Sequence, residues 1–153
     1  MSSSLSINIA KDSTNVLVTL GGRIDEDAHF DEILASSGES FIFDFSNVNL
    51  INSCGVREWI NLVNTLVAKA KIIYRQCPQI MIEQMNMVQG FLPSGASIES
   101  FYAPYFDPDL DQEVKVLLTL SEIKAKKAPI KKNDNGTELE FDALEAQYFN
   151  FIK

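Results

Sequence analysis

A dense apolar run in the first third of the chain constrains the fold more than any other feature. Phe41 to Phe45 is interrupted only by Asp44. A run of this kind is typical of a strand in the middle of a sheet that is buried on both faces. We therefore expect a sheet whose central strand is covered by other elements on each side.

Strand-like and helix-like patterns alternate around this run. Before it, apolar and polar side chains alternate as in a hairpin that ends at Gly21-Gly22, and after it apolar residues recur at helical spacing. The expected elements are two strands, an acidic helix, the buried strand, an amphipathic helix, a strand and a third helix, at residues 5–9, 16–20, 25–34, 41–45, 56–67, 72–74 and 78–90. This order predicts an α/β fold, a mixed β-sheet with helices packed on it.

The texture of the chain changes after Pro93. Two strand-like stretches, 97–106 and 114–120, flank an acidic loop and predict a β-hairpin. A lysine-rich polar stretch at 124–135 is expected to be a surface loop, and the chain from Phe141 fits a short terminal helix that docks on the body.

We divide the chain on this basis into two parts. Residues 1–95 form the α/β domain, with 103 as the alternative boundary, and 96–153 form a C-terminal extension of β-hairpin, Lys-rich loop and terminal helix.

Composition narrows the class of protein. A hydrophobic content of 46 % among 153 residues indicates a folded globule. The net charge of −8 argues against nucleic acid as a partner, and no stretch approaches the roughly 18 apolar residues of a membrane span. Residues 1–6 carry no pattern of a secretory signal, and two cysteines make no disulfide framework, so we expect a cytoplasmic protein.

The segment after the apolar run carries the functional signal. It passes from Asp44 through a short polar loop into Asn52-Ser53-Cys54-Gly55-Val56. This resembles the signature of the STAS domain family, the anti-sigma factor antagonist-like proteins, in which a buried strand ending in Asp leads to Asp-Ser-Ser/Thr-Gly at the start of a helix. Gly22-Arg23-Ile24-Asp25 resembles the family's Gly-x-Leu-Asp, and the order of elements extends the likeness over residues 5–103.

The resemblance implies a non-catalytic protein-interaction switch in bacterial signal transduction and transcription regulation. In the family's antagonists the first Ser of the signature, here Ser53, is phosphorylated by an anti-sigma kinase, which binds the unmodified form. The partner-binding residues it implies are Asn52, Ser53, Cys54, Gly55, Val56 and Asp25. Two positions depart from the pattern: Asn52 stands where the family has Asp, and Cys54 replaces a hydroxyl residue.

Physical chemistry permits this switch and also offers a simpler role for Ser53. A phosphate before a helix would meet unpaired N–H groups and add about −1.5 to −2 charge units. Ser53 could instead cap the helix and do nothing more. We expect Gly55 to allow a sharp turn and a close approach by the partner.

Two other functions remain open beside the switch. One is a constitutive scaffold subunit that keeps the fold without phosphorylation, which Asn52, Cys54 and the extension favour. The other is a sensor that binds a small ligand, although no motif supports it. We expect no catalytic residues, because His29 and Cys54 are the one pairing of base and nucleophile and nothing orients them.

The extension resembles a degenerate zinc ribbon. In its two turns, 101–113 and 133–142, or next to them, Asp107, Leu110, Lys132 and Asn135 stand where a ribbon has cysteines. Leu and Lys cannot serve as such ligands, so we expect no metal and no cofactor. The alternating carboxylates near Asp107 lack the spacing of a calcium loop and indicate a solvated turn.

Overall fold

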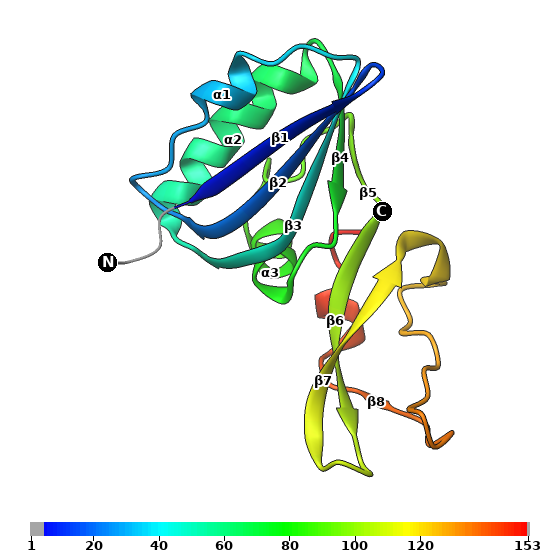
Figure 1. Ribbon diagram of the computed structural model, residues 1–153. Coiled ribbons are helices and arrows are strands. Elements are labelled where there is room, and N and C mark those ends of the chain that lie inside the picture. The colour runs from blue at the N-terminus through cyan, green and yellow to red at the C-terminus, as the bar shows by residue number, and fades with distance from the viewer. Residues whose placement is uncertain (1–4, 153) are drawn as a thin grey trace.

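Two β-sheets organise the chain, and the computed structural model describes it over residues 5–152 (Figure 1). The first sheet has the order β1-β2-β3-β4-β5, with β1 antiparallel to β2 and the other neighbours parallel. Its strands are β1 (Ser6–Asp12), β2 (Asn15–Ile24), β3 (Ser40–Ile51), β4 (Lys71–Arg75) and β5 (Ala96–Ile98). Helices pack on this mixed sheet, so the predicted α/β class is confirmed.

The described residues of this part, 5–98, form three helices: α1 (Asp31–Leu34), α2 (Ser53–Val67) and α3 (Gln79–Met87). α1 and α2 lie behind β1 and β2 in the view of Figure 1. The amphipathic pattern of α2 turns Val56, Trp59, Val63 and Leu66 into the core. α3 adds Met81 and Ile82 to the same cluster.

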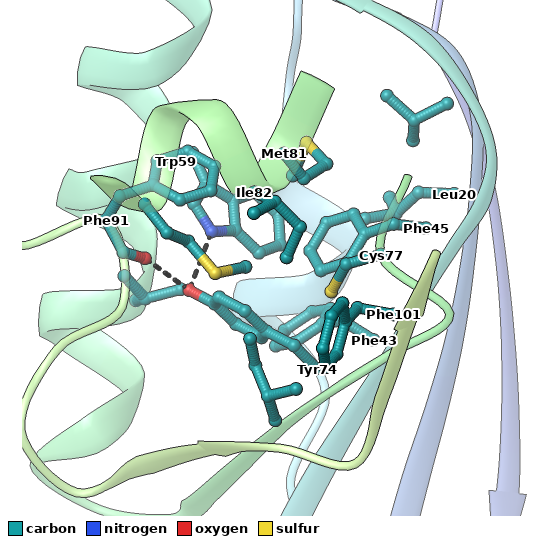
Figure 2. Close-up of a cluster of buried hydrophobic side chains, with 14 of the residues drawn as sticks. Leu20, Phe43, Phe45, Trp59, Tyr74, Cys77, Met81, Ile82, Phe91 and Phe101 are labelled. Carbon is teal, nitrogen blue, oxygen red and sulfur yellow. Dashed lines mark hydrogen bonds between the residues drawn. The ribbon is translucent and has the colours of Figure 1, made fainter. Parts of the chain in front are cut away.

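A polar link runs through the centre of this core (Figure 2). The indole Nε1–H of Trp59 donates to the hydroxyl of Tyr74 at 2.9 Å, and that hydroxyl donates to the carbonyl oxygen of Phe91 at 2.7 Å. All three residues are fully buried. The bonds satisfy polar atoms that would otherwise destabilise an apolar interior, and they tie α2, β4 and the segment after α3 together.

The apolar run is buried on one face only, which corrects the expectation of two covered faces. Phe41, Phe43 and Phe45 are buried, whereas Ile42 and Asp44 point to the other face and are half-buried. The reason is topological: β3 is a central strand, but the helices that contribute to its core all lie on the Phe side.

Three boundaries also differ from expectation. β2 continues through Gly21-Gly22 to Ile24, and β3 continues to Ile51, because the two strands pair to their ends despite two irregularities in register. The acidic helix shrinks to α1, since residues 25–28 form a turn closed by the Ala28 N–H donating to the Asp25 carbonyl at 3.0 Å.

The extension forms the second sheet, in the order β7-β6-β8. It contains the predicted hairpin and terminal helix, with bounds β6 (Ser100–Asp107), β7 (Gln112–Thr119), a 3₁₀ turn η1 (Leu120–Glu122), β8 (Glu140–Phe141) and α4 (Glu145–Tyr148). β5 is part of the first sheet, so the chain passes from one sheet to the other at Glu99.

The second sheet is docked on the first part by backbone and side-chain bonds. The Tyr102 N–H donates to the Cys77 carbonyl at 2.8 Å, and the Cys77 N–H donates to the Ser100 carbonyl at 3.2 Å. The Asn86 side chain donates from α3 to the Tyr148 carbonyl at 2.9 Å. Phe101 and Phe149 are buried in the core that the two parts share.

Residues 5–152 contain no cluster of His, Cys, Asp or Glu that could hold a metal ion. The likeness of the extension to a degenerate, metal-free ribbon stays a prediction. The two turns of the extension are joined by a side-chain amide instead. Asn133 Nδ2 donates to Asp107 Oδ1 at 3.0 Å and to Asp109 Oδ2 at 2.8 Å.

Across the same described range, no helix is long and apolar enough to cross a membrane. Residues 1–4, on which the expectation about a secretory signal partly rested, lie outside the described residues, as does Lys153.

Candidate functional site

The segment with the family-like pattern lies at the carboxyl ends of two adjacent parallel strands. Ile24 of β2 pairs with Ile51 of β3, and the next residue, Asn52, turns the chain into α2. The Asn52 N–H donates to the Ile24 carbonyl at 3.2 Å, which holds the turn against the end of β2. Sites in open parallel sheets gather at this edge, because the loops that follow neighbouring strands meet there.

Asn52, not Ser53, caps α2. Its Oδ1 accepts a hydrogen bond from the Gly55 N–H at 2.9 Å, the usual reach from an N-cap into the first turn. Its Nδ2 donates to Glu26 Oε2 at 2.8 Å. This bond is the main cause that lowers the pKa of Glu26 below its ordinary value. The expectation that Ser53 might serve only as a cap is therefore wrong, because the amide occupies that position.

Gly55 is required by packing inside the chain. A Cβ at this position would lie 2.0 Å from the Ile24 carbonyl oxygen and 2.5 Å from its carbon. The first turn of α2 thus rests directly on the backbone of β2. We expected a partner to approach Gly55 closely, but the backbone of Ile24 occupies that side of the glycine, and Gly55 itself is buried.

Ser53 and Cys54 are the exposed residues of the segment. Ser53 is the first residue of α2, and its hydroxyl has no hydrogen-bond partner among residues 5–152. Arg57, also exposed, follows four residues later and therefore lies on the same side of the helix. The site thus offers an exposed hydroxyl at a helix start with a cation one turn away.

Two other residues predicted for partner binding are buried. Val56 faces the core at 7 % exposure. Asp25 is also 7 % exposed; its Oδ1 accepts from the Asp27 N–H at 3.0 Å and its Oδ2 lies 3.5 Å from Arg23 Nε. Asp25 therefore shapes the acidic turn beside Asn52, and the exposed carboxylates of that turn are Glu26 and Asp27.

A shallow groove of about 230 Å³ continues the site along α2. It runs between the segment from Ala28 to Leu34 and the outer side of α2, where Glu58, Asn61 and Thr65 line it. Sequence reasoning missed these three residues, although the polar stripe of an amphipathic helix was the available signal. His29 lies in this groove and Cys54 at the helix start, and neither side chain has a hydrogen-bond partner among residues 5–152.

Comparison with known proteins adds a partial likeness in structure. No family model and no curated protein matches the sequence. The crystal structure of an anti-sigma factor antagonist from Mycobacterium paratuberculosis is similar to this chain with a TM-score of 0.42 and 19 % identity, over 50 % of this chain and 73 % of that chain. What this chain does has to be inferred from its own residues.

Proposed function

We propose that this chain is a protein-interaction switch of the anti-sigma factor antagonist kind, controlled by phosphorylation of Ser53. The observation that carries the proposal is an exposed serine at the first position of α2, beside a cap that another residue supplies. The side chain of Ser53 therefore does not cap the helix, which suits a residue that is phosphorylated and dephosphorylated.

The electrostatics of the site support a change of state on modification. The first N–H groups of a helix lack intrahelical partners, and Asn52 uses only that of Gly55. The N–H groups of Ser53 and Cys54 can therefore meet a phosphate, and Arg57 can pair with it from one turn away. On the other side the added charge would face Glu26 and Asp27, so a docked partner would meet a much more negative surface.

The surface that we assign to the partner combines this helix start with the groove along α2. Unmodified Ser53 and Cys54 are small, and the groove offers the exposed apolar Leu34 beside the polar Glu58 and Asn61. A partner whose face is partly apolar and carries no cation opposite Ser53 fits this surface, because a charge added at Ser53 would then stay unpaired in the interface. An anti-sigma kinase or a similar regulator is the partner class that we propose.

A constitutive scaffold without phosphorylation is the second candidate. The feature that favours it is the acidic turn beside the helix start, where the Asn52–Glu26 bond keeps a carboxylate at the residue that precedes Ser53. In that case the same surface binds its partner permanently, and modification plays no part.

The deciding experiment is phosphosite mass spectrometry on the protein from its native cells with phosphatases blocked. Phosphate on Ser53 supports the switch. A well-covered peptide in which Ser53 is always unmodified contradicts the switch and leaves the scaffold.

Binding assays with variants then test the direction of the switch. Ser53→Asp should weaken capture of the partner by about tenfold or more, because the new charge lies inside the docking surface. Ser94→Asp is the matched control, since Ser94 is also exposed but lies in the loop before β5. Equal capture by wild type and Ser53→Asp would refute the proposed direction.

A further inference from the structure

The face of the first sheet opposite the helices is open. In Figure 1 this face is turned towards the viewer, in front of α1 and α2. Leu17, Ile42 and Ile73 lie on it and are half-buried. They belong neither to the core cluster nor to the partly buried residues that pack on it. Three branched apolar side chains are thus presented away from the interior.

Strand pairing joins these side chains into one row. The register places Ala10, Leu17, Ile42 and Ile73 side by side across β1, β2, β3 and β4. The rows on either side are polar, and they consist of Asp12, Asn15, Ser40 and Lys71 on one side and Asn8, Thr19, Asp44 and Arg75 on the other. An apolar centre with a polar rim is the anatomy of a protein interface.

Two charges of this face have no partner within the described chain. Arg75 already pairs with Glu99 at 2.8 Å, and Asp44 accepts from the Ser46 N–H at 2.9 Å. Asp12 and Lys71 are exposed, and among residues 5–152 neither takes part in an ion pair or a side-chain hydrogen bond. They stand at opposite ends of the same row, one on β1 and one on β4.

We propose that this open face docks a second copy of the chain, related by a two-fold axis that runs along the strands between β2 and β3. This operation exchanges β1 with β4 and β2 with β3, and it keeps each row opposite itself. Asp12 then faces the partner's Lys71, and Leu17 packs on the partner's Ile42, each contact occurring twice by symmetry.

The charges select this axis over the other two-fold arrangement in the plane of the face. An axis along the apolar row would set Lys71 against the partner's Arg75, a like-charge contact. With the axis along the strands, Arg75 meets the partner's Asn8 and no like charges oppose each other. The face is therefore complementary to itself in one orientation.

The size of the face predicts a weak dimer. Four strands about 4.8 Å apart, of 7, 10, 12 and 5 residues at about 3.3 Å per residue, offer on the order of 500 Å² per chain. Two such faces bury on the order of 1,000 Å², the size of weak or transient complexes. The start of α2 lies on the helix side of the sheet, so this dimer leaves Ser53 accessible and does not depend on the proposed switch.

Sedimentation equilibrium of the full chain over a wide concentration range tests the proposal. Wild type should pass from monomer to dimer as concentration rises. Asp12→Lys and Lys71→Asp should each weaken the dimer by about tenfold, because each creates two like-charge contacts, and the double exchange should restore it. Ile42→Gln should also abolish the dimer without unfolding the chain, as judged by circular dichroism.

Lys69→Asp is the matched control, because Lys69 is also exposed and lies only two residues from Lys71, but it follows α2 and lies off the open face. The Lys69→Asp protein should dimerise with the same dissociation constant as wild type. The proposal is overturned if the chain stays monomeric at every concentration, or if the dissociation constant of the dimer is the same in wild type, in Asp12→Lys and in Lys71→Asp. Protection of this face from hydrogen exchange by a different protein, with the chain itself monomeric, also overturns it.

Discussion

Replacing Gly55 by alanine tests how tightly α2 is seated on β2. The added Cβ would lie 2.0 Å from the Ile24 carbonyl oxygen, whereas ordinary contacts begin near 3.4 Å. The first turn of α2 must therefore move by about 1 Å or more. This movement strains the bond from the Asn52 N–H to Ile24 and the cap from Asn52 to residue 55.

The expected cost is the sum of three effects. Forcing an atom into packed structure costs typically 1–3 kcal/mol, and loss of the cap costs about 1 kcal/mol. Replacing Gly by Ala in a helix returns up to about 1 kcal/mol. We expect a net loss of about 2 kcal/mol in the free energy of unfolding, or a fall of about 4–8 °C in Tm.

Urea denaturation and thermal melting followed by circular dichroism measure this loss. Cys54→Ala is the control, because Cys54 is the exposed neighbour in the same turn and its replacement should stay within about 0.5 kcal/mol. A Gly55→Ala protein as stable as wild type would refute the argument that α2 rests on the Ile24 backbone.

Three further predictions concern stability. Asn52→Ala should cost about 1 kcal/mol in urea denaturation and should return the pKa of Glu26 towards its ordinary value in an NMR titration, since Asn52 donates to that carboxylate. Tyr74→Phe should cost about 2–4 kcal/mol, because Trp59 Nε1–H and the Phe91 carbonyl lose their buried partner; a change below 1 kcal/mol would contradict this. Burial raises the pKa of Tyr74 and of Tyr148, and it raises the pKa of Tyr105 to about 12. The free energy of unfolding should therefore be constant below about pH 10 and fall as the pH rises towards 12, together with the rise of tyrosinate absorbance. A free energy of unfolding that does not change over this window would count against the prediction.

The sequence alone determined the class of fold and the order of its elements. Alternating residues in β1 and β2, the Phe-rich run of β3 and the helical spacing of α2 are local periodicities, and they reflect which side chains must leave water. The segment from Asn52 to Val56 was chosen as the candidate site through its resemblance to the STAS signature and not through periodicity, because a serine and a glycine before a helix are common on their own.

The tertiary structure alone decided what each residue of that segment does. Asn52 rather than Ser53 became the cap, and Gly55 became a packing position, because Ile24 lies against the first turn of α2 although it is 31 residues earlier in the chain. Likewise β3 reached Ile51 only because β2 extends beside it to Ile24.

The open face of the sheet is the clearest example of a feature that local sequence could not predict. The same apolar sequence can form a strand that is buried on one face or a strand that is buried on both faces. The presence of Ile42 between Phe41 and Phe43 does not show which of the two applies. That depends on whether a helix elsewhere in the chain crosses to the second face, and here the core-forming helices stay on one side. Periodicity shows which side chains are apolar enough to be buried, whereas the element that covers them is determined by contacts between residues distant in sequence.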